Sequence, residues 1–385
     1  MRFFVLGLML LALLGSNAWS AEVNDSALKS AGQNQSEWLH YGRDYGQQRF
    51  SPLNQINVTN VNRLVPKWIY QTGISATFQT SPLVVDGVMY LTTPFSHVAA
   101  VDARTGREKW RYEHKRRSEK LCCGPANRGA SIGYGKIFVA TVDARLIALD
   151  QKTGKPVWDI KLAEHSKQVT EDKASMTTAD PLQNRNVTGS TGVGATFAPL
   201  VYEGKVIVGI TGVGYGLHLD SPRPGAPLGA VVGVAGRYGR PGFIAAYDAE
   251  TGTQIWKFET THAGWEGSYR THTPDGVPMF RDIATEKSKQ AQFADAWKHG
   301  GGSIWHTPTV DIKTGILYFG TGNPSPQAAD STRPGDNLYT VSLVALDSAT
   351  GRLVWYYQQV PHDMWGYDVA SPPTLFDLEI DGRIV

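Results

Sequence analysis

The chain has 385 residues and is nearly neutral, since 37 Lys and Arg residues against 35 Asp and Glu residues leave a formal net charge of +2. This balance argues against a protein whose main task is binding nucleic acid or an acidic membrane. Hydrophobic residues make up 41% of the chain, and its 41 glycines and 11 tryptophans are typical of short strands joined by tight turns. The composition therefore predicts an ordered protein with many short strands and a large core, and the length allows one large β domain or two ordinary domains.

The first twenty residues have the pattern of a secretory signal peptide. Arg2 precedes a short apolar run, and small residues flank Trp19 where cleavage before Ala21 is expected. The run is shorter than the roughly 20 residues that span a bilayer, and no later stretch is apolar enough to do so. We therefore expect residues 1–20 to be removed and residues 21–385 to be exported to the periplasm without a membrane span.

Four segments share one pattern: an apolar strand, an aspartate, a Thr-Gly turn and a strand that carries a tryptophan. They are 98–112, 146–160, 243–259 and 342–358, with aspartates Asp102, Asp150, Asp248 and Asp347 and tryptophans Trp110, Trp158, Trp256 and Trp355. Alternating apolar residues around a turn glycine predict a β-hairpin in each segment.

A second hairpin pattern precedes each of these segments, at 81–93, 130–141, 198–210 and 307–323. Two hairpins form a four-stranded sheet, which is one blade of a β-propeller. We therefore predict four blades, and a fifth that begins at Ser371 and is incomplete at Val385. Because an incomplete propeller leaves an open sheet edge, we expect this sequence to be the N-terminal part of a longer propeller domain.

Irregular insertions separate the hairpins at 165–195, 212–242 and 260–302, and the last contains a possible short helix near Thr285–Trp297. Long insertions on one face of a propeller usually build a binding site or a lid. The two cysteines, Cys122 and Cys123, are adjacent. In an oxidising compartment they would form a strained, rigid disulfide, because consecutive Cα atoms are closer than in ordinary disulfides. The alternative is a pair of small buried hydrophobic side chains.

The blade pattern resembles the tryptophan-docking repeats of the quinoprotein dehydrogenases, which use pyrroloquinoline quinone (PQQ). The resemblance runs from about Trp38 to Val385. Its motifs are CCGPANRG (122–129), GGSIWHTPTVD (301–311), GTGNPSPQAADSTRPGDNLYT (320–340) and an altered PHDMWGYD (361–368). The family's methanol and ethanol dehydrogenases resemble an eight-bladed propeller with PQQ near the axis. The resemblance thus implies that four to five of eight blades are present here.

The resemblance also implies a set of PQQ-binding residues. Trp305 matches the tryptophan that stacks on one face of PQQ, where the alternative is a core tryptophan. The pair Cys122 and Cys123 matches the vicinal disulfide on the other face. Arg128 matches the arginine that bonds the quinone oxygens, a task that suits a guanidinium and would stabilise negative charge. Further positions that align with groups bonding the PQQ carboxylates are Thr196, Thr211 and Gly212.

A metal beside PQQ is implied by Asn323, which matches a metal ligand in the motif GTGNP. An amide oxygen suits a hard cation such as Ca²⁺, which would polarise the quinone carbonyl. The alternative is a turn asparagine before Pro324. The sequence does not choose between Ca²⁺ and a lanthanide, because three family carboxylates are replaced here, by Gln79, Gly214 and Gly366.

Asp368 is our candidate to replace the catalytic aspartate that the family has at Gly366. In an extended segment these two positions point to the same face. Lanthanide-dependent relatives carry an aspartate at the second position as a metal ligand, so Asp368 is expected to act as base or ligand. The alternatives are an ordinary strand-end aspartate, or replacement of the lost carboxylates by Asp363, Asp220 or Glu266.

Two histidines, His306 and His362, either shuttle protons near this site or are ordinary hydrogen-bonded side chains. The sequence lacks a C-x-x-C-H motif, so electrons are expected to pass to a separate acceptor such as a soluble cytochrome c, or to a haem domain beyond Val385.

The resemblance implies a periplasmic dehydrogenase that oxidises an alcohol by hydride transfer to PQQ. Asp368 would accept the hydroxyl proton, and Arg128 and the metal would stabilise charge on the quinone. The alternative is a non-catalytic propeller scaffold or a pseudo-enzyme that binds PQQ. The retained cysteines, Arg128, Trp305 and Asn323 favour the enzyme, whereas the three lost carboxylates favour the alternative.

Overall fold

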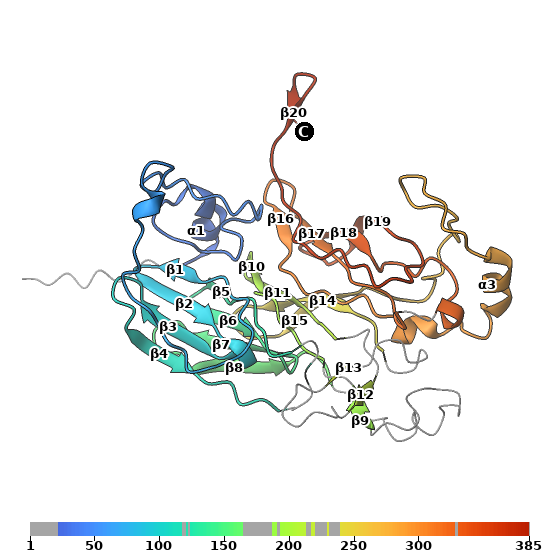
Figure 1. The fold of residues 1–385 in the computed structure, drawn as a ribbon, viewed down its shortest axis with the longest axis horizontal. Helices are drawn as coiled ribbons and strands as arrows, with labels where there is room; N and C mark the ends of the chain where they lie inside the picture. The colour runs from blue at the N-terminus through green and yellow to red at the C-terminus, as the bar shows by residue number, and fades with distance from the viewer. Residues whose placement is uncertain are drawn as a thin grey trace, which may run out of the picture.

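The computed structural model describes residues 22–117, 121, 124–164, 187–190, 193–212, 217–219, 229–230, 239–327 and 330–384. In this part of the chain, four antiparallel four-stranded sheets follow one another (Figure 1). They are the four predicted blades of the β-propeller. The predicted signal peptide and the two cysteines lie outside the described residues, as does most of the insertions at 165–195 and 212–242.

Each blade consists of two consecutive hairpins. The first blade contains β1 (Leu83–Val85), β2 (Val88–Thr92), β3 (Val98–Asp102) and β4 (Glu108–Tyr112). The second contains β5 (Ser131–Gly133), β6 (Lys136–Ala140), β7 (Arg145–Asp150) and β8 (Pro156–Lys161). The third contains β10 (Leu200–Tyr202), β11 (Lys205–Gly209), β14 (Phe243–Asp248) and β15 (Gln254–Glu259). The fourth contains β16 (Thr309–Asp311), β17 (Ile316–Gly320), β18 (Ser342–Asp347) and β19 (Leu353–Gln358).

The Asp-Thr-Gly turn of each blade is held by its own aspartate. Asp102 Oδ1 accepts hydrogen bonds from the backbone N–H groups of Arg104 and Thr105 and from the Thr105 hydroxyl, at 3.1, 2.8 and 2.9 Å. These donors hold the pKa of Asp102 below its ordinary value. The same bonds recur at Asp150, Asp248 and Asp347. A local hydrogen-bonded turn therefore sets the second hairpin of every blade.

Tryptophans join neighbouring blades. Each indole N–H donates to a backbone carbonyl in the turn of the next blade, from Trp68 to Ala103 (3.1 Å), Trp110 to Gln151 (3.1 Å), Trp158 to Ala249 (3.2 Å) and Trp256 to Ser348 (3.0 Å). The ring covers the turn glycine: a Cβ added at Gly154 would lie 2.4 Å from the Trp110 ring. The φ of +70° at Gly154 also favours glycine. Trp68 was not predicted from the sequence, because no aspartate-bearing hairpin accompanies it.

The core lies along the inner strands of the blades. All five residues of β6 are buried, whereas the outer strand β8 is mostly exposed. The inner strands therefore form the core of the blades, where polar groups need hydrogen-bond partners.

The remaining elements lie outside the blades. At the N-terminal side are α1 (Asp25–Lys29), η1 (Ala31–Gln33), η2 (Val61–Arg63) and, within the first blade, η3 (Pro94–Ser96). A small three-stranded sheet has the strand order β13 (Gly229–Ala230), β12 (Leu217–Leu219) and β9 (Val187–Ser190). The predicted fifth-blade hairpin is β20 (Glu379–Ile380) and β21 (Arg383–Ile384), which extends away from the four sheets (Figure 1).

The insertion 260–302 contains two short helices rather than the single one predicted near Thr285–Trp297. Helix α3 (Ile283–Lys289) begins earlier, because the Asp282 carboxylate accepts the N–H of Thr285 at 3.0 Å and caps it. Trp297 lies in the separate η4 (Ala296–His299), and η5 (Asp330–Thr332) follows β17. Among the residues described, we find no helix with the length and hydrophobicity of a membrane span.

Candidate functional site

Backbone hydrogen bonds join segments at the inner ends of the blades, some within one blade and some between neighbouring blades, and the predicted site residues lie in or beside these segments. In each bond a backbone N–H donates to a backbone carbonyl: Arg128 to Thr196 (2.8 Å), Thr211 to Gly194 (2.7 Å), Ile304 to Ile210 (2.9 Å), Gly322 to Ser303 (2.8 Å) and Val369 to Thr321 (3.1 Å). Residues that are far apart in the sequence are therefore brought to one region.

Arg128 contacts both Thr196 and Trp305. Its Nη1 donates to the Thr196 hydroxyl at 2.9 Å, and its guanidinium carbon lies 5.0 Å from the Trp305 ring centroid. Burial lowers the pKa of Arg128, but a guanidinium stays charged in proteins. The buried Asn127 holds this loop by donating to the carbonyl of Ala140 at 2.7 Å. A fixed cation thus stands over an aromatic face.

Asp368 lies at the other end of Trp305. The indole N–H of Trp305 donates to Asp368 Oδ2 at 3.0 Å, and the backbone N–H of Asn323 donates to Oδ1 at 2.6 Å. Burial raises the pKa of Asp368, while these two hydrogen bonds lower it in part. The approach is close, since a Cβ added at Gly322 would lie 2.9 Å from Oδ1. Arg128, Trp305 and Asp368 therefore form one continuous arrangement.

Asn323 and Asp368 are neighbours and supply oxygen donors of the kind that hard cations prefer. The Asn323 side-chain amide donates to the Pro324 carbonyl at 2.8 Å, which leaves its oxygen for another partner. In the described ranges, no group of three or more His, Cys, Asp or Glu side chains is suited to hold a metal. A metal here would therefore have to draw further ligands from elsewhere, as hard cations do from waters, carbonyls or a bound cofactor.

The other candidate carboxylates are engaged differently. The buried Asp363 accepts the backbone N–H groups of Trp365, Gly366 and Tyr367 at 2.9, 3.0 and 2.9 Å. Burial raises the pKa of Asp363. Its carboxylate shapes the loop that leads to Asp368. Gln79 is exposed, Glu266 is half-buried with no described contact to this site, and Gly214 and Asp220 lie outside the described residues.

Gly366 is the position at which the resemblance placed a catalytic aspartate. Its φ is +78°, and an added Cβ would lie 1.4 Å from Gln327 Nε2. The Gln327 side chain thus fills the space beside Gly366. An aspartate there would need Gln327 to move and would have to adopt a left-handed backbone conformation.

Thr211 is the clearest sign of an unfilled hydrogen bond. It is 6% exposed, and its hydroxyl has no partner among the described residues. Buried hydroxyls are normally hydrogen-bonded. Thr211 pairs with Gly194 across an isolated bridge and precedes Gly212, so it lies on the segment that contacts the Thr196 region. An unpaired hydroxyl here fits a bound polar ligand.

The two histidines are hydrogen-bonded to backbone groups. His306 Nε2 lies 3.1 Å from the Val369 carbonyl oxygen and 3.2 Å from the Gly320 nitrogen. Burial lowers the pKa of His306 to about 4, so it is neutral at pH 7. His362 Nδ1 lies 2.6 Å from the Gly335 carbonyl, and burial lowers its pKa as well. Both histidines therefore fit the ordinary interpretation rather than proton shuttling.

These residues fit a flat, polyanionic quinone. Trp305 offers an aromatic face, Arg128 a cation with several N–H donors, and Thr211 an unpaired hydroxyl. A flat ring would be held by Trp305, with Arg128 supplying N–H donors to its oxygens.

Comparison with known proteins agrees with this architecture. Residues 38–385 match the family described as the glucose/ethanol/alcohol dehydrogenase β-propeller domain with PQQ. Quinohemoprotein alcohol dehydrogenase ADH IIB of Pseudomonas putida is 35% identical over 95% of this chain and 46% of its own length. The quinoprotein alcohol dehydrogenase PedH of Pseudomonas putida is 32% identical over 99% of this chain and 56% of its length. The chain thus spans about half the length of these relatives.

Solved structures are also similar. The quinohemoprotein alcohol dehydrogenase ADHIIG of Pseudomonas putida HK5 superposes with a TM-score of 0.72 at 32% identity, over 95% of this chain and 46% of that one. A europium-containing methanol dehydrogenase gives a TM-score of 0.71 at 28% identity, over 93% of this chain and 55% of that one.

Proposed function

Because the chain belongs to the PQQ-dependent glucose/ethanol/alcohol dehydrogenase family of β-propellers, we propose that it is part of an exported dehydrogenase that oxidises an alcohol or a related hydroxyl compound. The observation that carries this proposal is the arrangement of Arg128, Trp305 and Asp368. It places a cation against a flat aromatic ring, and the ring's N–H against a half-buried carboxylate.

The binding residues for PQQ in this proposal are Trp305, Arg128, Thr196, Thr211 and Gly212, together with Cys122 and Cys123. PQQ, when bound, supplies the electrophilic quinone that takes two electrons from the substrate as a hydride. Trp305 would support the ring, and its indole N–H is already oriented by Asp368. Arg128 would stabilise negative charge through N–H donors that Thr196 helps to hold in place.

Asp368 is the proposed general base. To accept the hydroxyl proton it must be ionised, and its two N–H donors favour the ionised form. Burial raises its pKa, which makes the carboxylate a stronger proton acceptor than an exposed aspartate. The proton would reside on an oxygen that Trp305 or Asn323 already contacts, so the same groups control its affinity.

Asn323 and Asp368 are also the proposed metal ligands. A hard cation bound there would act as a Lewis acid beside the quinone. A solved relative is named as europium-containing, so a lanthanide is tested alongside Ca²⁺. The same proposal includes export to the periplasm and a cytochrome-type electron acceptor. The acceptor is suggested by the names of two relatives, one a quinohemoprotein and the other the dehydrogenase subunit of an alcohol dehydrogenase.

The loss of the carboxylate at Gly366 supports one second candidate, a protein that binds PQQ without turnover. Glycine has no carboxylate, and the Gln327 side chain fills the space in which one would lie. The two candidates differ in whether Asp368 performs the proton transfer.

The test is a PQQ titration of the full-length protein, followed by quenching of tryptophan fluorescence, in Ca²⁺, in La³⁺ and with a chelator. Dye-linked oxidation of a panel of alcohols follows in the condition that binds best. Metal-dependent binding with turnover is the expected result. Binding without turnover for any alcohol would support the pseudo-enzyme, and no binding would overturn both candidates in favour of a scaffold.

A further inference from the structure

Two loops carry the proposed metal and base residues. The Asn323 loop comprises residues 323–327, and the Asp368 loop comprises residues 363–368. They meet directly where the Asn323 N–H donates to Asp368 Oδ1 at 2.6 Å. That single bond leaves open what fixes the separation of the two loops, since neither belongs to a strand.

Arg333 lies between these loops and is fully buried. Its Nε donates to the Pro326 carbonyl at 2.8 Å and its Nη2 to the Gln327 carbonyl at 3.2 Å, both in the Asn323 loop. The same Nη2 donates to the Asp363 carbonyl at 2.5 Å, at the start of the Asp368 loop. One rigid guanidinium therefore bonds the backbones of both loops.

The guanidinium is itself held in place. Its Nη1 donates to Asn337 Oδ1 at 2.6 Å, and the Asn337 amide donates back to the Arg333 carbonyl at 3.0 Å. A planar fork with fixed donors can hold several carbonyls at set positions, which a lysine ammonium cannot do. The Arg333 guanidinium is therefore held in one orientation between the two loops.

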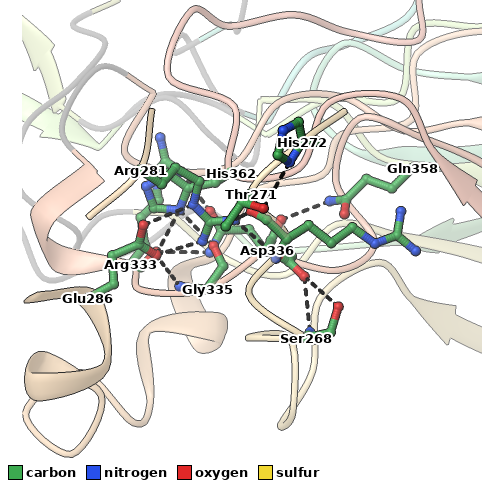
Figure 2. Close-up of polar contacts among 12 residues, drawn as sticks. Ser268, Thr271, His272, Arg281, Glu286, Arg333, Gly335, Asp336, Gln358 and His362 are labelled. Atoms are coloured by element: carbon green, nitrogen blue, oxygen red, sulfur yellow. Dashed lines mark hydrogen bonds and ion pairs between the residues drawn. The ribbon is translucent and has the colours of Figure 1, made fainter. Parts of the chain in front are cut away.

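Figure 2 shows a network of hydrogen bonds and ion pairs beside Arg333, and the side chains of Arg281 and Asp336 in it are only 3% and 2% exposed. Arg281 donates to Asp336 at 2.7 Å and to Glu286 at 2.6 Å, and Glu286 accepts the Gly335 N–H at 3.0 Å. Gln358, at the end of β19, donates to the Asp336 carbonyl at 2.8 Å. The insertion 260–302 and the fourth blade therefore together fix the segment from which Arg333 projects.

The position of the Asp368 loop then follows from Asp363. Its carbonyl accepts from Arg333, and its carboxylate accepts three consecutive N–H groups at 365–367. A displacement of Asp363 would therefore move the whole turn that leads to Asp368. The Asn323 loop would move in the same way with Pro326 and Gln327.

We propose that Arg333 is a positioning residue that sets the separation of Asn323 and Asp368 by bonding the carbonyls of both loops. It does not touch the proposed PQQ-binding residues Arg128, Thr196 or Trp305 in any described hydrogen bond. The effect of Arg333 on metal binding and turnover rests on the proposed function, whereas its effect on the position of the two loops does not.

The test compares Arg333→Lys with Arg43→Lys in the full-length protein. Arg43 is a matched control, because it is also buried and also donates to two backbone carbonyls, those of Asn34 and Glu37, away from the site. The first readout is amide hydrogen exchange without PQQ or metal. Arg333→Lys is expected to speed exchange at 321–327 and 363–369 by at least about tenfold, and Arg43→Lys only around 34–49.

The second readout uses metal and PQQ. Arg333→Lys is expected to raise the metal concentration for half-saturation by about 10- to 100-fold, as loss of outer-shell contacts does. The value of kcat should fall by about 10- to 100-fold, with KM and the PQQ dissociation constant nearly unchanged. Arg43→Lys should lower Tm without either effect.

If Arg333→Lys is too unstable to purify, Asn337→Gly replaces it. That variant keeps Arg333, accommodates the φ of +62° at Asn337 and removes the amide that orients the guanidinium, so smaller changes at the same two loops are expected. Exchange at both loops that stays at the wild-type rate, or that rises equally in every blade, would overturn the positioning role. If the wild type binds no PQQ, the proposed function fails, and hydrogen exchange alone decides the role of Arg333.

Discussion

Trp158 and Trp305 use the same side chain in two different ways. The Trp158 indole donates to a backbone carbonyl in the next blade, and its ring covers Gly252. The Trp305 indole donates to the Asp368 carboxylate, and its ring lies under a guanidinium. Because its acceptor is a neutral carbonyl, Trp158 contributes to the stability of the propeller. Because its partners are charged, Trp305 affects the protonation of Asp368 and the binding of a ligand. The regular blades and the site can therefore be perturbed separately.

The largest effect is expected from Asp368→Asn, which keeps the shape of the side chain but removes the proposed base. Turnover should fall by about 10²- to 10⁴-fold, the range for loss of a general base. PQQ affinity should change little, because Arg128 and Trp305 remain. Dye-linked oxidation and fluorescence titration measure the two quantities. Turnover at the wild-type rate would exclude Asp368 as the base.

A pair of tryptophan variants tests the comparison itself. Trp158→Leu should lower Tm by about 4–10 °C through lost packing between blades and leave PQQ affinity unchanged. Trp305→Leu should weaken PQQ binding by about tenfold or more through lost stacking, with a smaller fall in Tm. Thermal melting gives the Tm of each variant, and PQQ titration gives the PQQ affinity of each. Equal effects on both quantities would show that the two tryptophans share one role.

A pair of glycine variants examines how closely the site is packed. A Cβ at Gly322 would lie 2.9 Å from Asp368 Oδ1, so Gly322→Ala should displace the carboxylate and lower kcat by about tenfold. A Cβ at Gly252 would lie 3.2 Å from Trp158 at a φ of +73°. Gly252→Ala should therefore lower Tm and spare kcat per folded molecule. A wild-type kcat in Gly322→Ala would show that the carboxylate tolerates displacement.

The smallest effects concern pH. Burial raises the pKa of Asp368, and a base works only when ionised, so kcat/KM should rise with pH along a limb above the ordinary aspartate range. Trp305→Phe removes a donor that lowers this pKa and should move the limb to higher pH. At Asp150, hydrogen bonds from Thr153 lower the pKa, so its contribution to stability is present above its ordinary pKa and is lost as pH falls through the lowered value. Profiles of kcat/KM and Tm against pH distinguish the two aspartates.

Only part of the candidate site was predictable from the sequence. Motifs pointed to Asp368, Arg128, Trp305 and Asn323, and the structure brings Asp368 into contact with both Trp305 and Asn323. Arg333 was not predicted, although it lies within one of the quoted motifs. The reason is that its partners in the two loops are backbone carbonyls, which every residue type carries and which a sequence motif therefore does not reveal.

Gly366 illustrates the same limit. The sequence shows the loss of a carboxylate, but only the structure shows Gln327 in the adjacent space. Similarly, Trp68 docks on the first blade like the other tryptophans, with a partner 35 residues away. Contacts of this kind depend on how separate segments fold together.

The sequence alone determined the blades of this protein. Each Asp-Thr-Gly turn closes through hydrogen bonds between residues at most five positions apart, so the information for a hairpin is local and recurs four times. Only the tertiary structure decided the site. Trp305 and Asp368 are 63 residues apart, and their contact requires the inner ends of neighbouring blades to meet. The hydrogen bonds of the turns can be predicted from short sequence motifs. The pKa and the position of Asp368 instead depend on its burial and on the hydrogen-bond donors that folding brings to it from distant segments.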